Sequence, residues 1–316
     1  MKDLKIRWAL HGPETEPTAR QRGMLIYRHL QSLGYDADAW DLQEPADIIV
    51  CQYDLKHLDN ALATGAVVVQ DVNDQVFAEH HAWHQRFVDN IHKAHAVVAG
   101  TDRLAQHLTR MHPFVRVIQE PVDDRYLAVK PKKHRGMNLI FMGMHDNVSY
   151  LTEVDNVLER LAYSHEFTVN FVIPKKDGFG NSNKSKVDAK PYSTSFHEWD
   201  MDTLLSQMAV ADIGLVPLFH NGWTMCKSNN KLMSFCAAGI PSVASDLQQY
   251  RSSIRHGYDG FVATSEDDWQ DAISSLLTNV AQRRKIGSNA HINASRWATN
   301  VISAQWEKLF QEIRYT

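Results

Sequence analysis

The feature that most constrains the fold is the alternation of short apolar runs with longer amphipathic segments. Runs such as residues 66–69 and 96–99 contain only alanine and valine, and a polar turn and a helix-like segment follow. Strands that are buried on both faces have this continuous apolar character, and their alternation with helices is typical of a parallel sheet. We therefore expect an α/β protein with doubly wound parallel sheets.

The alternation occurs twice along the chain. One series begins at residues 4–10, and a second begins at residues 137–142. Between them, residues 121–135 contain prolines and a basic cluster, which favours an interdomain linker; a basic patch for an anionic membrane or nucleic acid is the alternative. Because 316 residues are about twice a typical domain, we expect domains over residues 1–128 and 129–300.

Local patterns extend this scheme to particular elements. Residues 20–33 are expected to form one helix that Gly34 ends, and residues 78–94 a second long helix. Residues 174–192 are polar and rich in Lys, Gly, Asn and Ser, which predicts a surface loop. No strand is predicted between that loop and residues 213–216.

Composition excludes several classes of protein. A net charge of −4 and a pI near 6.5 argue against a general nucleic-acid-coating role. The three cysteines have neither disulfide nor metal-site spacing, and no apolar run is long enough to span a membrane. We expect a cytoplasmic protein, peripheral to the inner membrane face if the basic linker binds lipid.

The stretch from Cys226 to Asp246 predicts a polar, cationic turn, a short helix, a Gly-Pro break and a small buried strand. Lys227, Ser228 and Asn229 lie where that helix begins. Free backbone N–H groups and a lysine converge there, which is an arrangement that binds phosphate. The alternative is that Ser228 or Asn229 only caps a helix whose lysines are solvated.

An ordered series of motifs resembles the C-terminal half of GT-B glycosyltransferases. The series comprises Asp212–Leu218, Trp223, Lys227, Lys231, Ala237–Pro241, Ala244-Ser245, Gly257–Val262 and Trp269. It is similar to the large retaining family (family 4-like) that includes sucrose, mannosyl and cell-surface polysaccharide transferases. The resemblance runs from about Gly143 to about Trp306, roughly half the chain.

This resemblance implies two Rossmann-like doubly wound domains that face each other across a cleft. The first would bind the acceptor and the second the nucleotide-sugar donor, and residues 301–316 would form a helix that packs back on the first domain. Lys227 and Lys231 would then be catalytic, because they would neutralise the charge on the departing nucleotide diphosphate. The implied donor-binding residues are Gly12, Gly143, His145, Ser228, Asn229, Asn230 and Asp246. For Gly143, a plain strand-to-helix turn is an equal alternative.

The sequence departs from the family at one informative place. Many members carry a Glu-x7-Glu pair, whose positions are occupied here by Cys226 and Ser234. The chain is similar to a bacterial subset with Lys-Cys-x-x-Lys-Leu that also lacks the pair. Asn229, Asn230 and Asp246 are the expected substitutes for the missing ribose contacts.

The acceptor side is predicted from polar residues after the central strand of the first domain. Asp71, Asn73 and Asp74 resemble an Asp-x-Asp-Asp motif of some bacterial members, with Asp71 or Asp74 orienting the attacking hydroxyl as a catalytic group. The alternative is that they cap the next helix and pair with a nearby base. The acceptor-binding candidates are Arg20, Asn73, His80 and His81. His80 and His84 are one helical turn apart, but no third ligand is evident, so we expect neither metal nor cofactor.

The expected function is a metal-independent, retaining glycosyltransferase that moves a sugar from a nucleotide-diphosphate sugar to a hydroxyl acceptor, a glycan or a glycolipid. One alternative is a transferase that acts on a hydroxylated DNA base, although the net charge of −4 disfavours a nucleic-acid partner. A sugar-nucleotide epimerase and a non-catalytic sugar-nucleotide-binding scaffold are further alternatives, the latter because the glutamate pair is missing.

Overall fold

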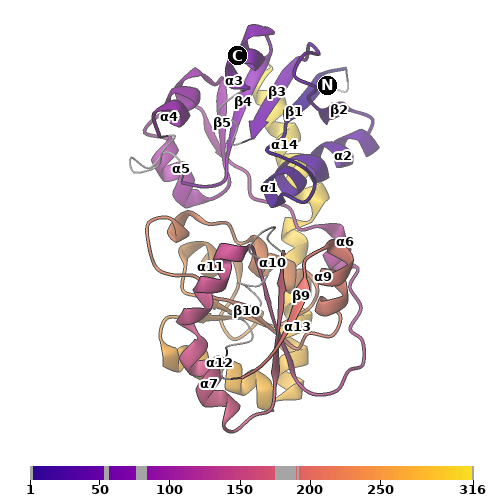
Figure 1. The fold of residues 1–316 in the computed structure, drawn as a ribbon. Coiled ribbons are helices and arrows are strands. Elements are labelled where there is room, and N and C mark those ends of the chain that lie inside the picture. Colours follow the sequence, from indigo (N-terminus) through magenta and orange to yellow (C-terminus); the bar gives the residue numbers. More distant parts are fainter. Residues whose placement is uncertain (1–2, 53–56, 76–83, 175–189, 191, 315–316) are drawn as a thin grey trace. The chain divides into compact units, whose positions relative to one another are not determined.

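The computed structural model describes residues 3–52, 57–75, 84–174, 190 and 192–314 (Figure 1). The chain divides into two compact units. Unit 1 contains Met1–Asp123, Met225–Ser228 and Trp297–Thr316, and unit 2 contains Asp124–Thr224 and Asn229–Arg296. Each unit has a six-stranded sheet whose strands pair in parallel. The expected α/β, Rossmann-like fold class is confirmed.

The sheet of unit 1 has the strand order β2-β1-β3-β4-β5-β6. The order reverses between β1 and β3, so this is the switch point of the sheet, where ligands of doubly wound proteins bind. β3 and β5 are buried along their whole length, as their continuous apolar sequences require. The strands are β1 (Lys5–Ala9), β2 (Asp36–Ala39), β3 (Ile48–Gln52), β4 (Val67–Val72), β5 (Ala96–Ala99) and β6 (Val115–Val117).

The first helical region of unit 1 differs from the expected single helix. It begins at α1 (Pro17–Ala19), passes through a π-helical turn at Arg20–Met24 and continues as α2 (Leu25–Ser32). The π turn buries both of its arginines, which a regular exposed helix face would not do. The remaining helices are α3 (Leu58–Ala63), α4 (His84–Lys93), α5 (Asp102–Leu108) and α14 (Thr299–Ile313).

The last helix, α14, belongs to the core of unit 1. The rings of Trp306 and Phe310 pack against Trp8 of β1, with centroid separations of 6.2 and 5.9 Å. At the surface, the Tyr35 hydroxyl donates a hydrogen bond of 2.6 Å to Glu307. The C-terminal end of the chain therefore completes the first unit, since buried aromatic pairs contribute strongly to packing.

The sheet of unit 2 has the order β12-β11-β10-β7-β8-β9, with its switch point between β7 and β10. β9, which the sequence did not predict, is a parallel edge strand with a polar, half-exposed sequence. It begins just after the predicted surface loop, most of which lies outside the described residues. The strands are β7 (Asn138–Met142), β8 (Thr168–Ile173), β9 (Ser193–Glu198), β10 (Ile213–Val216), β11 (Ser242–Ser245) and β12 (Phe261–Ala263).

Helices surround this second sheet. A 3₁₀ turn, His145–Glu153, follows β7, and a short helix, α6 (Asp124–Leu127), interrupts the predicted linker. Glycine at position 287 lets α13 approach the backbone of Gly239, because an added Cβ would collide with the Gly239 carbonyl oxygen. The helices are α6, α7 (Asp155–Ala162), α9 (Met201–Met208), α10 (Asn230–Ala237), α11 (Gln248–Ser253), α12 (Glu266–Thr278) and α13 (Val280–Ala294).

A helix that crosses a bilayer must be both long and predominantly apolar. None of the helices in the described ranges combines the necessary length with a sufficiently apolar composition.

Candidate functional site

A compact polar cluster lies at the carboxyl end of β7 in unit 2. Lys231 is in the first turn of α10, and its Nζ donates a hydrogen bond of 2.5 Å to Oδ1 of Asn147. The same oxygen accepts a 3.0 Å bond from the backbone N–H of Met144, which fixes the amide. Together with Gly143, the first residue after β7, these residues form what we call the Lys231 cluster: Gly143, Asn147 and Lys231.

Gly143 is required by this geometry. A Cβ at position 143 would lie 2.8 Å from Oδ1 of Asn147 and 3.0 Å from Nζ of Lys231. Any side chain would therefore displace the lysine, the amide or both. The glycine does more than make a turn, because its missing side chain leaves room for the Lys231 cluster.

The position of the cluster within the sheet is also informative. β7 and β10 are the two strands between which the strand order of unit 2 reverses. Ligands of doubly wound proteins bind outside the carboxyl ends of the strands at this point. The backbone N–H groups in the first turn of a helix such as α10 have no partner within the helix, and they favour anions. The structure brings Gly143 and Lys231, two residues predicted separately, to one place.

The other donor-binding candidates of unit 2 make local contacts. Asn229 is buried and donates a 2.8 Å hydrogen bond to the Ser253 hydroxyl. The carboxylate of Asp246 pairs with Arg251 at 2.7 Å. Asn230 accepts a 2.9 Å bond from the Ser234 hydroxyl through its backbone oxygen.

The Asn229–Ser253 bond ties the start of α10 to α11, and the roles of the three residues in ribose binding stay predictions. His145 begins the 3₁₀ turn that follows β7. Its donor contact likewise stays a prediction.

In unit 1, the predicted catalytic residue Asp71 forms a buried ion pair with Arg22. The Nε of Arg22 lies 2.9 Å from Oδ2 of Asp71, and both side chains are only 1% exposed. Arg22 also donates a 2.9 Å bond to the Ile118 carbonyl. Burial raises the pKa of Asp71 against the attraction of Arg22. Burial alone would lower the pKa of Arg22, but the nearby carboxylates raise it. This pair fixes the π turn to the end of β4.

Asp74 lies two residues beyond the end of β4 and contacts Lys227. Their Nζ and Oδ1 atoms are 2.7 Å apart, and the side chains are 29% and 22% exposed. Asn73 donates a 2.8 Å bond to the Thr18 hydroxyl. Lys227, predicted to hold the donor diphosphate, thus contacts a carboxylate of unit 1, as in the pairing alternative. Its catalytic role and that of Asp74 stay predictions.

Glu120 is a residue of this region that the sequence did not single out. It is 8% exposed, and its Oε2 accepts a 2.9 Å hydrogen bond from the Ser228 hydroxyl. Burial raises the pKa of Glu120; Arg22 and the bond from Ser228 oppose this, while Asp74 and Asp71 add to it. One signal was available, because Glu120 is a charged residue just beyond β6, and strand ends are where sites occur.

The remaining predicted site residues are Gly12, Arg20, His80 and His81. Gly12, after β1, has a φ of 108°, a conformation that favours glycine. Arg20 is buried, and its Nη1 donates a 2.9 Å bond to the Glu14 carbonyl. His80 and His81 lie outside the described residues. Within the ranges that the structure describes, no group of three or more His, Cys, Asp or Glu side chains could hold a metal ion.

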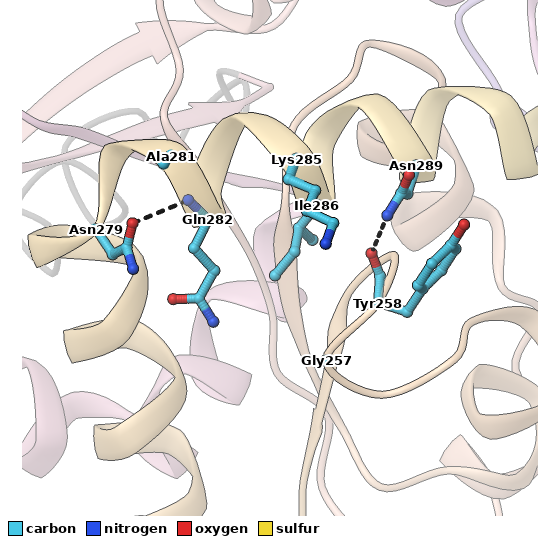
Figure 2. A pocket seen from close by; sticks show the side chains of 8 residues that line it. All are labelled: Gly257, Tyr258, Asn279, Ala281, Gln282, Lys285, Ile286 and Asn289. Atoms are coloured by element: carbon cyan, nitrogen blue, oxygen red, sulfur yellow. Dashed lines mark hydrogen bonds between the residues drawn. The ribbon is translucent and has the colours of Figure 1, made fainter.

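Two hollows on unit 2 lie beside α13. One, of about 480 Å³, lies between α13 and Gly257-Tyr258; Figure 2 shows Lys285 and Asn289 reaching from the helix toward Tyr258. Asn289 donates a 2.8 Å hydrogen bond to the Tyr258 carbonyl. The second hollow, of about 570 Å³, is lined by arginines 251, 255 and 296 among other residues. Neither hollow is lined by a predicted site residue.

The chain is similar to known proteins in sequence and in fold. Residues 136–279 match the family described as glycosyl transferases group 1. The chain is also 40% identical over 85 residues to exopolysaccharide phosphotransferase SCO2592 of Streptomyces coelicolor, a match that spans 26% of this chain and 9% of that relative.

Among solved structures, a glycosyltransferase from Rickettsia africae is similar, with a TM-score of 0.76 and 12% identity over 98% of this chain and 99% of that one. Anabaena Alr3699/HepE, in complex with UDP and glucose, has a TM-score of 0.74 and 13% identity over 98% and 100% of the two chains. At these identities the likeness shows the fold. The chain has the GT-B fold, and the match of residues 136–279 supports a glycosyltransferase.

Proposed function

We propose that this protein transfers a sugar from a nucleotide-diphosphate sugar to a hydroxyl acceptor, with the donor diphosphate at the Lys231 cluster. The observation that carries the proposal is the convergence of Gly143, Asn147 and Lys231 at the switch point of the second sheet. That cluster lies inside the segment, residues 136–279, that matches group 1 glycosyl transferases.

The chemistry follows from the charge that develops when the donor bond breaks. Negative charge accumulates on the departing diphosphate, and a cation fixed beside it lowers the barrier. Lys231 supplies that cation, held by the Asn147 amide. The first N–H groups of α10 add a partial positive charge. A metal ion is not needed for this role, so we propose a metal-independent reaction.

We further propose that the anomeric configuration is retained. In that route the leaving phosphate oxygen deprotonates the incoming hydroxyl on the same face of the sugar. It therefore requires no pair of carboxylates placed as in the glycosidases. The resemblance of the Gly239-Ile240-Pro241 segment to retaining members supports this proposal.

Donor and acceptor are proposed from two kinds of support. The Anabaena neighbour was solved with UDP and glucose, which supports a uridine donor. The name of the Streptomyces relative supports a glycan acceptor. We place the acceptor on unit 1, near the carboxyl end of β4, where Asn73 and Asp74 lie.

A ligand panel tests the proposal. Thermal unfolding would be followed with UDP, GDP, ADP, CDP and their common sugars, on the wild type, Lys231→Ala and Lys285→Ala. A ligand at about 100 times its Kd stabilises a native protein by about 2.7 kcal/mol. We expect one nucleotide to stabilise the wild type and the Lys285→Ala control, whose exposed lysine lies on α13, but not Lys231→Ala.

Turnover provides the second readout. Removing one group that stabilises developing charge costs about 10²–10³ in kcat, so Lys231→Ala should lose activity on that scale while Lys285→Ala keeps it. The anomeric proton signals of the product would report retention, and activity in excess EDTA would report metal independence. Stabilisation by a nucleotide sugar without turnover would favour the sugar-nucleotide-binding scaffold, and no stabilisation by any nucleotide sugar would contradict the proposed donor site.

A further inference from the structure

We propose that Glu120 is a positioning residue for the donor-binding lysine Lys227. Its buried carboxylate holds Ser228, and this bond fixes the segment Met225–Ser228, which we call the 225–228 strap. The inference rests on the proposed function and on the expectation, from the motif resemblance, that Lys227 also binds the donor, and it adds a residue that the resemblance does not include.

The strap is held by three neighbouring strand ends of the first sheet. Lys227 contacts Asp74, two residues after β4, and the Cys226 carbonyl accepts a 3.3 Å bond from Thr101, two residues after β5. Ser228 donates to Glu120, three residues after β6. β4, β5 and β6 are adjacent in the sheet. Three successive residues are therefore fixed along one sheet edge, although they come from the second half of the chain.

The contacts that hold the 225–228 strap differ in how far they are exposed to solvent. The side chains of the Asp74–Lys227 pair are 22–29% exposed, and solvent weakens an ion pair that it can reach. Glu120 is 8% exposed, and a buried polar group is costly to leave without its hydrogen bond. Glu120 is thus the side-chain anchor at Ser228, beside the buried Thr101–Cys226 bond, whereas Asp74 holds Lys227 by a contact that an incoming phosphate can replace.

The environment of Glu120 allows its role in positioning Lys227 to be tested separately from a role in the stability of the fold. Arg22, Asp71 and Asp74 are the charged groups that act on it. Burial raises the pKa of Glu120 above that of an unfolded chain, so its contribution to folding is present at low pH and is lost as the pH rises through the folded pKa. At neutral pH a glutamine, which carries no charge and still offers an oxygen acceptor, should not lower the melting temperature.

The experiment measures donor affinity, KM and kcat for Glu120→Ala, Ser228→Ala, the double variant and Glu120→Gln. Loss of the anchor should weaken donor binding about tenfold in either alanine variant. The double variant should lose no more than one of them, because both remove the same bond. Glu120→Gln should bind the donor like the wild type, since it keeps the acceptor. Glu312→Ala is the control, at a half-buried glutamate of α14 that pairs with Arg116 and lies outside the strap.

Three outcomes would overturn the proposal: wild-type affinity in both alanine variants, additive losses in the double variant, or a Glu120→Gln variant as weak as Glu120→Ala. If Glu120→Ala does not fold, Ser228→Ala and Glu120→Gln still decide the question. A wild type that binds no nucleotide sugar is a different result, because it overturns the proposed function itself.

Discussion

The carboxyl edges of the two sheets hold their cationic side chains in different ways. At the edge of unit 1, cations lie against carboxylates: Arg22 with Asp71, and Lys227 with Asp74. In the Lys231 cluster of unit 2, the lysine bonds to a neutral amide, and the third member is a glycine. Both groups lie at the carboxyl ends of strands in doubly wound sheets, the Lys231 cluster at the switch point of unit 2 and the ion pairs of unit 1 at the end of β4.

The difference shows which side chains make a sheet edge rigid and which make it suited to binding an anion. A buried ion pair fixes two elements to each other, and breaking it is costly because one charge is left without its partner. An amide oxygen orients a lysine through a hydrogen bond and carries no net charge itself, and a glycine leaves room beside it. Unit 1 therefore has the edge that holds chain segments in place, and unit 2 the edge suited to an anion.

The largest expected effect is on the buried pair of unit 1. Arg22→Met should lower the free energy of unfolding by about 3–5 kcal/mol, because the Asp71 carboxylate remains buried without its partner. Urea unfolding would measure the loss, with Arg110→Met, an exposed arginine of the same unit, as the control. Arg22→Met/Asp71→Leu should recover most of it. A loss no greater than that of Arg110→Met would contradict a structural role for the pair.

The next effect concerns the space in the Lys231 cluster. Gly143→Ala should weaken nucleotide binding by about 1–3 kcal/mol, since the new methyl group must displace Asn147 or Lys231. Titration calorimetry with the nucleotide found in the ligand panel would measure it. Asn147→Ala gives a comparison, because it removes the hydrogen bond to Lys231 without filling the space. If Gly143→Ala bound the nucleotide like the wild type, the cluster would not be the diphosphate site.

The smallest effect is at the surface of unit 1, where Tyr35 bonds to Glu307 of α14. Tyr35→Phe should cost about 1 kcal/mol at pH 7 through the lost hydrogen bond. Burial first, and then the Glu307 carboxylate, raise the pKa of Tyr35 from 10.0 to about 12.

The sign of the pH dependence follows from that shift. A folded pKa above the unfolded value contributes stability below pH 10, and this stability is lost as the pH rises through about 12. The difference in unfolding free energy between wild type and Tyr35→Phe should therefore narrow between pH 10 and 12. A difference that stays constant over this range would contradict the assignment.

Much of the fold could be predicted because buried parallel strands leave a local signature. Ala96–Ala99, Ile213–Val216 and Ser242–Ser245 are strands over the predicted residues. The edge strand β9 was missed because its polar sequence carries no apolar run; it forms by pairing with β8 along six residues of each strand.

Some site residues could be predicted and others could not, because only some of them belong to a local sequence pattern. Gly143 and Lys231 stood out, since a glycine after a strand and a lysine at a helix start are short-range patterns. Glu120 did not, because its partner Ser228 is 108 positions away in the sequence. Lys227 was identified from the sequence, but the sequence did not show that its partner is Asp74, which is 153 positions away.

The sequence by itself determined the alternation of strands and helices, the two series of buried strands and the residues available for binding an anion. These depend on the order of apolar, polar and glycine residues within a few positions. Only the tertiary structure decided that the 225–228 strap lies on the edge of unit 1 and that Glu120 anchors it. Such contacts depend on where distant strand ends come together in space, and no local pattern of residues records that.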